Sequence, residues 1–207
     1  PQRLPSRPVQ SPQKDIVDWE IDRRGNVRVG HGFTGDQRRG VLKLKDAEGD
    51  WHDVSGLLDR EARVLAKPTK NTNRYYILML PQSTPAADDP GLRHVYEYDV
   101  SSGEETALFA PDHSEVATVL MDFKGEEIVM VRYQDEAEAP LIFDPQLQEI
   151  YATLQEAFPG ARVSLQSITD DLSRAVFGVS SPLIPGALYL YDAAKRELAA
   201  FRHQYPG

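Results

Sequence analysis

A short apolar stretch that ends in aspartate occurs four times along the 207-residue chain, and this repeat constrains the fold more than any other feature. The successive aspartates are separated by 53, 45 and 48 residues. A period of this length is typical of folds in which each repeat is one supersecondary unit stacked against the next. The four stretches are Val41–Asp46, Val95–Asp99, Leu141–Asp144 and Leu188–Asp192.

The parts of each repeat come in the same order. Two stretches rich in β-branched or aromatic residues, joined by a polar turn, precede the stretch that ends in aspartate, which predicts three antiparallel strands. In three repeats a further polar turn leads to a fourth strand, near Trp51, Phe109 and Phe201. Four-stranded units recurring about every 40–50 residues indicate propeller blades. A sandwich of unrelated hairpins is the alternative, but it gives no reason for a constant order and period.

The third repeat contains a helical pattern where the other repeats have a fourth strand. Asp144 is a suitable N-cap, Pro145 suits the first helical position, and Pro159-Gly160 ends the pattern. An apolar stripe at this spacing predicts a helix that packs on its own sheet. The stripe consists of Leu147, Ile150, Tyr151, Leu154 and Phe158.

The sequence therefore predicts an all-β fold, a partial β-propeller of about four four-stranded antiparallel blades with one short helix near 145–158. Residues 1–14 carry four prolines and no apolar core, which predicts a linker or an irregular segment before a propeller over 15–207. Because the first residue is Pro1, we interpret the chain as part of a longer one. The predicted blades are 15–60, 61–110, 114–158 and 161–205.

The charge and residue content narrow the range of partners. Thirty-two acidic and 23 basic residues give a formal charge of −9, which opposes binding to nucleic acid and to anionic lipid. No window approaches the roughly 18 consecutive apolar residues of a membrane helix, so we expect a soluble chain. The absence of cysteine excludes disulfides and thiolate chemistry without distinguishing the cytoplasm from the periplasm.

The sequence predicts no catalytic residue in this chain. The string that comes closest to a hydrolase nucleophile motif, Gly178-Val179-Ser180-Ser181-Pro182, lacks the second glycine and leads into another loop rather than a helix. Asp112-His113-Ser114 contains the three residue types of a catalytic triad. Neighbouring residues on an extended chain point in alternate directions, so these three cannot form the relay.

Metal and cofactor sites are not predicted either. The five histidines are not spaced to place two imidazoles on one helix face, and no glycine-rich phosphate loop precedes a helix. We therefore expect no metal and no cofactor. One arginine is a candidate substrate-binding residue, because an arginine on the inner rim of a propeller can bind a peptide carboxylate. That residue is Arg28.

The ordered set of turn and strand residues resembles the propeller half of prolyl oligopeptidase-type serine peptidases, particularly the acylaminoacyl-peptidase and dipeptidyl-aminopeptidase-like branch. The resemblance covers roughly residues 15 to 205 and lies in the order of several short motifs. These are Trp19-x-x-Asp22-x-x-Gly25-x-x-Arg28, Trp51 after Asp46-Ala47-Glu48-Gly49, Tyr96-x-Tyr98-Asp99 with Gly103, Phe143-Asp144-Pro145, and Pro185-Gly186 before Tyr189-Leu190-Tyr191-Asp192.

The resemblance implies a two-part enzyme, in which a propeller covers an α/β-hydrolase domain that carries the serine, aspartate and histidine. Because those motifs are not in this chain, it implies a non-catalytic propeller fragment that gates and scaffolds peptide access to a hydrolase domain elsewhere in a parent serine peptidase. Four blades of a larger ring leave two flanks uncovered, so a homodimer of the fragment is another expectation. The alternatives are a stand-alone binding propeller whose loops meet a protein or glycan partner, and a small hydrolase in its own right.

Overall fold

The computed structural model describes residues 10–35, 38–68, 70–82, 91–122, 124–135, 138–169, 171–182 and 184–203, except for the side chains of residues 184–185 and 201–203. Residues 10–14 carry no helix or strand, and residues 1–9 of the predicted linker lie outside the described part. The division of the chain at residue 14 stays a prediction. Among the described residues, no helix is long and apolar enough to cross a membrane.

The described strands form four antiparallel sheets, which we call blades 1 to 4 in chain order. Blade 1 contains β1 (Ile16–Ile21), β2 (Val27–Phe33), β3 (Gly40–Lys45) and β4 (Trp51–Asp53). Blade 2 contains β5 (Arg63–Ala66), β6 (Arg74–Met79), β7 (His94–Asp99) and β8 (Glu105–Phe109). Blade 3 contains β9 (Val116–Met121), β10 (Ile128–Tyr133) and β11 (Leu141–Ile142). Blade 4 contains β12 (Arg162–Ile168), β13 (Arg174–Ser181), β14 (Ile184–Asp192) and β15 (Glu197–His203).

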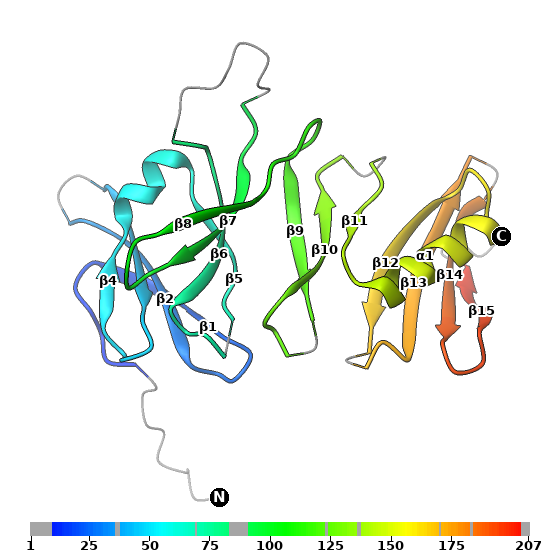
Figure 1. Cartoon of the computed structure of the whole chain (residues 1–207), viewed down its shortest axis with the longest axis horizontal. Coiled ribbons are helices and arrows are strands. Elements are labelled where there is room, and N and C mark those ends of the chain that lie inside the picture. Colours follow the sequence, from blue (N-terminus) through cyan, green and yellow to red (C-terminus); the bar gives the residue numbers. More distant parts are fainter. Residues whose placement is uncertain are drawn as a thin grey trace, which may run out of the picture.

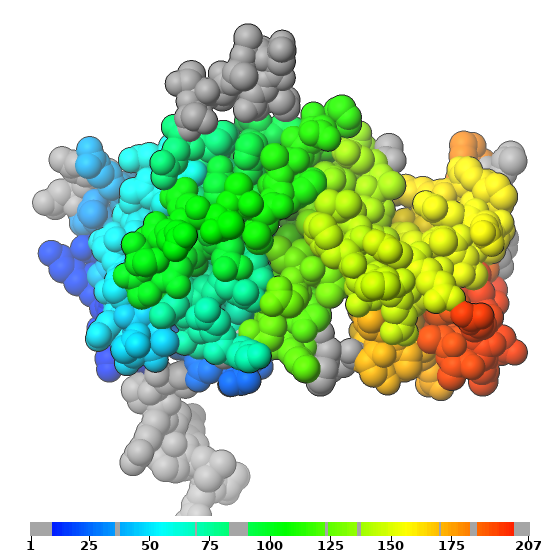
Figure 2. Space-filling model, in the orientation of Figure 1, coloured from blue at the N-terminus to red at the C-terminus, as the bar shows by residue number. Residues whose placement is uncertain are grey.

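Every blade is a meander whose strands pair in sequence order, and the blades follow one another in space (Figure 1). Because each blade is one continuous stretch of chain, the colours in Figure 2 run in order from one end of the molecule to the other. This arrangement confirms the predicted all-β fold, a partial propeller. It also excludes a sandwich of unrelated hairpins, since the four units repeat one topology.

Blade 3 has three strands, and helix α1 (Pro145–Ala157) follows where the other blades have a fourth. The helix begins as predicted, because an Asp144 side-chain oxygen accepts a hydrogen bond of 2.9 Å from the backbone amide of Leu147. Its apolar side packs against blade 4 and against β10 and β11 of blade 3. The helix therefore lies between two blades rather than on its own sheet alone. The buried helix residues are Leu147, Ile150, Tyr151 and Leu154.

Blade 2 shows how the blades are held together, because both of its faces are buried. Along β6, Tyr75, Ile77 and Met79 pack against blade 1. Leu78, which lies between the last two in the sequence, packs against blade 3. Successive side chains of a strand point to opposite faces, so a strand between two blades is apolar throughout. Three apolar clusters, one at each contact between neighbouring blades, form the core.

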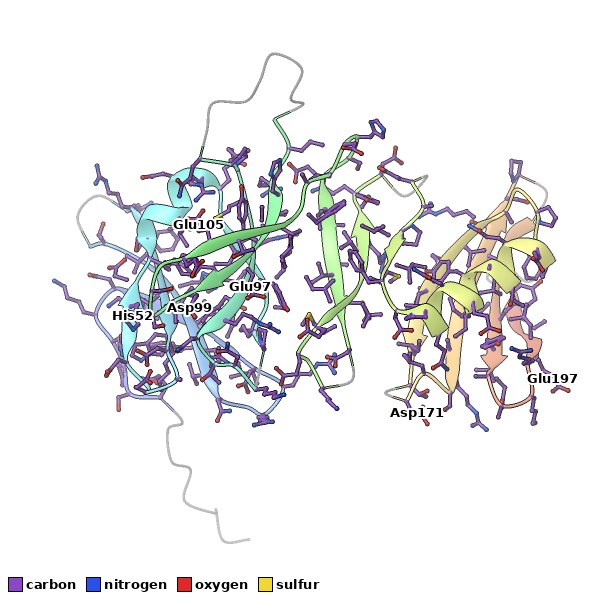
Figure 3. All side chains as sticks on the ribbon, in the orientation of Figure 1. His52, Glu97, Asp99, Glu105, Asp171 and Glu197 are labelled. Carbon is purple, nitrogen blue, oxygen red and sulfur yellow. The ribbon has the colours of Figure 1, made fainter. Side chains whose placement is uncertain are left out.

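The recurring aspartates are explained by the turns at one end of the blades. The side chain of Asp99 accepts hydrogen bonds from the amides of Ser101 and Ser102, and that of Asp46 accepts one from the amide of Asp50. Asp22, Asp122 and Asp171 do the same in the first hairpins of blades 1, 3 and 4. Asp99 and Asp171 are labelled in Figure 3. A side-chain acceptor that fixes a tight turn accounts for the repeat without any catalytic role.

A second helix was not predicted. The 3-10 helix η1 (Ser55–Arg60) connects β4 of blade 1 to β5 of blade 2, and its Leu57 and Leu58 pack against the apolar cluster between these blades. No hydrogen-bonding side chain caps its first turn, so the usual sequence signal for a helix start is missing.

Candidate functional site

Arg28, the candidate substrate-binding residue, lies on β2 with only 3% of its side chain exposed. Its guanidinium group donates to the carbonyl oxygens of Pro68 at 2.8 Å and Thr72 at 2.6 Å, and its Nε donates to the hydroxyl of Tyr75 at 3.1 Å. The guanidinium carbon also lies 4.8 Å from the centre of the Tyr75 ring. Arg28 therefore joins blade 1 to the segment between β5 and β6 of blade 2.

Asp22 supplies the counter-charge for Arg28. An Asp22 carboxylate oxygen lies 3.6 Å from a guanidinium nitrogen, and the Asp22 side chain is fully buried. Burial by itself would raise the pKa of Asp22, but hydrogen bonds from Asn26 and from the amide of Arg24, with the charge of Arg28, lower it overall. These contacts describe an internal clamp between blades. A contact between Arg28 and a peptide substrate stays a prediction.

A second charged cluster links β1 and β2 of blade 1 to the segment that follows β5. Glu20 hydrogen-bonds to the ring of His31 at 2.6 Å and to the ammonium group of Lys67. The hydrogen bond with His31 is the main cause that lowers the pKa of Glu20 to about 2, and the bond and charge of Lys67 add to it against the opposing effect of burial. This cluster ties β1 and β2 of blade 1 to the segment that follows β5 of blade 2.

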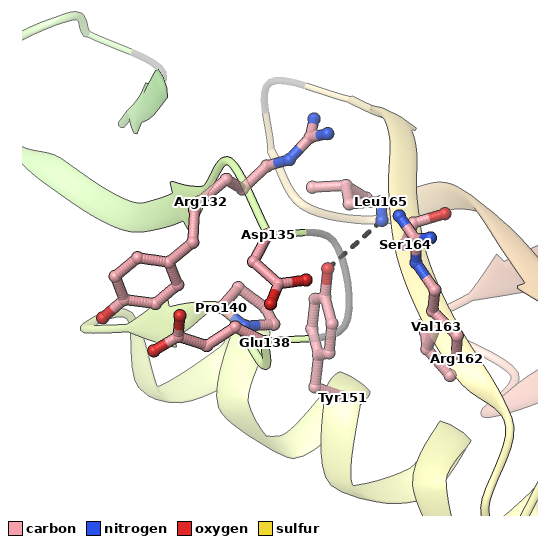
Figure 4. Close-up of a pocket in the computed structure, with 10 residues that line it drawn as sticks. Arg132, Asp135, Glu138, Pro140, Tyr151, Arg162, Val163, Ser164 and Leu165 are labelled. Atoms are coloured by element: carbon pink, nitrogen blue, oxygen red, sulfur yellow. Dashed lines mark hydrogen bonds between the residues drawn. The ribbon is translucent and has the colours of Figure 1, made fainter. Parts of the chain in front are cut away.

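A cleft between blades 3 and 4 holds the most varied set of polar side chains (Figure 4). Arg132 reaches into it from β10, and Arg162 borders it at the start of β12. Asp135 and Glu138 follow β10, and Tyr151 extends from α1. A small cavity of about 40 Å³ shares Tyr151 with a broader hollow of about 500 Å³ beside Phe158 and Gly160.

Tyr151 gives this cleft a fixed hydrogen-bonding group. Its hydroxyl accepts a hydrogen bond of 3.2 Å from the amide of Leu165, and its ring packs edge-on against Phe177 at 5.5 Å. Burial raises the pKa of Tyr151, so the hydroxyl keeps its proton at neutral pH. The cleft thus combines a hydroxyl donor with two guanidinium groups and two carboxylates, which suits a polar, peptide-like ligand.

The sequence did not single out this cleft, because its polar residues come from three separate segments. Arg132, Glu138 and Arg162 are not adjacent in any motif, and each looks like an ordinary surface charge in the sequence. The only available signal was Tyr151, a residue with a polar hydroxyl inside the apolar stripe of the helix. A buried tyrosine usually has a hydrogen-bond partner, but the sequence does not say which.

The serine strings considered above lie in regular or turn structure. Gly178 to Ser181 belong to β13, where Gly178 pairs with Leu188 of β14, so no strand-to-helix turn presents a nucleophile there. In the turn between β8 and β9, the hydroxyl of Ser114 accepts a hydrogen bond of 3.0 Å from the amide of Asp135. Among the described residues, no three His, Asp or Glu side chains are grouped so that they could hold a metal ion.

Comparisons with known proteins give one finding at the level of structure. No family model and no curated protein matches the sequence. A solved structure from a structural and mechanistic analysis of two prolyl endopeptidases aligns with 90% of this chain at 15% sequence identity and a TM-score of 0.47. The alignment covers 26% of the matched chain, so this chain spans about a quarter of that protein.

Proposed function

We propose that the chain is a non-catalytic propeller segment of a serine peptidase, which gates and scaffolds peptide access to an α/β-hydrolase domain outside these 207 residues. The observation that carries the proposal is the stacking of four meanders of one topology through three apolar clusters. The ordered motifs that resemble prolyl oligopeptidase-type propellers support the peptidase assignment.

The far face of blade 1 supports a place inside a larger ring. Leu42 and Leu44 of β3 pack toward blade 2, so Lys45 points to the opposite face. On that face Lys45 lies over the ring of Trp51, which in turn contacts Trp19 at 5.1 Å between ring centres. These side chains are partly buried within the described chain, and the two indole rings form an aromatic surface of the kind that a neighbouring blade covers.

The far face of blade 4 is complementary in kind. Phe177 and Tyr191 pack toward α1 and blade 3, so Val176 and its register partner Leu190 point outward. The outward face of blade 4 is aliphatic, and that of blade 1 is aromatic. The contact between blades 1 and 2 joins the same two kinds of face, because Leu42 and Leu44 of blade 1 pack against tyrosines of blade 2. The two end faces therefore suit further blades of the same ring or, as the alternative proposal, a second copy of this chain.

The gating role is tested on the full-length gene product. We expect it to contain a hydrolase segment with a Gly-x-Ser-x-Gly motif and to cleave a chromogenic short peptide much faster than a folded protein. Trp51→Glu should loosen the ring and reduce that size discrimination, whereas Trp51→Phe, which keeps an aromatic ring at that face, is the matched control. A gene product without a hydrolase segment would favour a stand-alone binding propeller, and peptide hydrolysis by these 207 residues alone would refute the non-catalytic assignment.

A further inference from the structure

The three contacts between neighbouring blades are not filled in the same way. Blades of a propeller spread apart toward their outer strands, so a wedge opens between each pair. Between blades 1 and 2 the helix η1 contributes Leu57 and Leu58 to the wedge. Between blades 3 and 4 the helix α1 contributes Leu147, Ile150 and Leu154. In both cases the chain that leads from one blade to the next supplies the filling side chains.

The wedge between blades 2 and 3 has no such helix. The connection over residues 110–115 joins β8 directly to β9 and carries no helical turn. A groove of about 230 Å³ remains between β7 and β8 on one side and β10 and β11 on the other. Leu108 and Phe143 border it with 47% and 49% of their surface exposed. Its other apolar lining residues are Tyr76, Val95, Phe109, Ile128 and Val131.

The groove lies between blades 2 and 3, and α1 lies between the next pair, blades 3 and 4. Helix α1 packs between β10 and β11 of blade 3 and β13 and β14 of blade 4, against residues that include Met130 and Phe177. The opposite face of β10, which carries Val131, borders the groove instead. A helix with an apolar stripe thus fits the equivalent wedge in this same protein.

Along blade 3, a strand is a poorer fit to the groove than a helix. The outer edge of blade 3 is β11, which has only two residues, so it offers few backbone groups for pairing. The carbonyl oxygen of Ile142 in β11 already accepts a hydrogen bond of 2.6 Å from the side chain of Gln148. On the blade 3 side, side-chain packing rather than backbone pairing must therefore dominate recognition, whereas β8, the edge strand of blade 2, has five residues.

The charge at one end of the groove selects the kind of helix. Glu97, labelled in Figure 3, and Glu127 both border the groove and share one guanidinium group, at 3.3 Å and 3.1 Å from nitrogens of Arg74. Two carboxylates with one guanidinium leave a net negative charge. The side chain of Glu127 is 68% exposed, so it is available to a cation on a ligand.

We propose that this groove is a docking site for an amphipathic helix of a separate protein partner, with a stripe of aliphatic or aromatic residues and a lysine or arginine at the end near Glu127. The helix lies in the wedge between blades 2 and 3 as α1 lies in the next wedge, and it covers Leu108 and Phe143. This surface is independent of the cleft in Figure 4, because the two share no lining residue.

The probe for this site is a helical peptide derived from α1 itself. A fluorescein-labelled, side-chain-stapled peptide of residues 145–158 with Glu149→Lys and Glu156→Lys keeps the apolar stripe and reverses the charge. We expect it to bind the intact chain with a Kd of about 1–100 μM in a fluorescence anisotropy titration. Leu108→Asp and Phe143→Asp should each weaken binding at least about tenfold, which corresponds to about 1.4 kcal/mol. The control Phe33→Asp, at an exposed phenylalanine outside the groove, should change binding less than about twofold.

A charge comparison separates this site from nonspecific apolar adsorption. The same stapled peptide with its natural glutamates should bind more weakly, and Glu127→Lys should abolish that difference. Leu108 and Phe143 are about half exposed and Glu127 is more than half exposed, so each variant should retain the circular dichroism spectrum of the parent protein. The proposal is overturned if the lysine peptide does not bind at about 1 mM, or if Phe33→Asp weakens it as much as Phe143→Asp. It is also overturned if sedimentation shows that Phe143→Asp dissolves a dimer, since the occupant is then a second copy.

Discussion

Replacing Arg28 by methionine tests whether this residue is a clamp between blades. The substitution keeps the length of an unbranched side chain and removes the donors to Pro68, Thr72 and Tyr75. It also leaves the buried carboxylate of Asp22 without its counter-charge. Breaking one partner of a buried pair costs about 3–5 kcal/mol. Asp22 retains its hydrogen bonds from Arg24 and Asn26, so we expect a loss near the lower limit, about 3 kcal/mol.

Urea unfolding followed by tryptophan fluorescence measures this loss, because both tryptophans, Trp19 and Trp51, lie in blade 1 beside the clamp. The double variant Asp22→Asn with Arg28→Met should recover part of the stability, since no buried charge is then left unpaired. A loss below about 1 kcal/mol would refute the clamp. In the full-length protein, a raised KM for peptides with unchanged stability would instead establish Arg28 as a substrate ligand.

Three further substitutions test the remaining contacts, each by urea unfolding. The pKa of Glu20, about 2, lies below its ordinary value of 4.5. Its contribution to the free energy of unfolding is therefore complete above pH 4.5 and is lost as the pH falls toward 2. Glu20→Gln should cost about 1 kcal/mol at pH 7, allowing for the partial exposure of Glu20, and this cost should vanish near pH 2. A cost that does not change with pH would contradict this assignment. Asp144→Ala should cost about 1 kcal/mol by removing the N-cap of α1, while Asp144→Asn should be nearly neutral. Leu154→Ala should cost about 2–5 kcal/mol, because Leu154 is fully buried between blades 3 and 4, whereas a loss below 1 kcal/mol would mean that α1 does not fill that wedge.

The sequence predicted the strands well because the blades depend on local patterns. Stretches rich in β-branched or aromatic residues mark the strands, and an aspartate that accepts hydrogen bonds from the following turn marks the end of some, as at Asp46 and Asp99. Helix α1 was predicted for the same reason, since Asp144, Pro145 and the apolar stripe are all local signals. Its position between two blades was not predicted, because that depends on how far the blades diverge.

The candidate sites could not be predicted to the same degree, because they depend on contacts between distant segments. Arg28 stands between Val27 and Val29, and nothing local shows that its partners are Pro68, Thr72 and Tyr75 of the next blade. An arginine on a strand is expected to be exposed, so its burial is a tertiary effect. The cleft in Figure 4 has the same origin, since Arg132 and Arg162 come together only when blade 4 packs on α1.

The filling of each wedge follows from the chain that crosses it. The connection from β11 to β12 covers residues 143–161, which is long enough for a helix of several turns, and the wedge is filled by α1. The connection from β4 to β5 covers residues 54–62 and holds only the short η1. The connection over residues 110–115 is shorter still and has no helical turn, so it leaves Leu108 and Phe143 about half exposed. The apolar groove beside Leu108 and Phe143 is therefore a consequence of connection length. Because the two filled wedges each hold a helix, a helix from another protein is compatible with this groove.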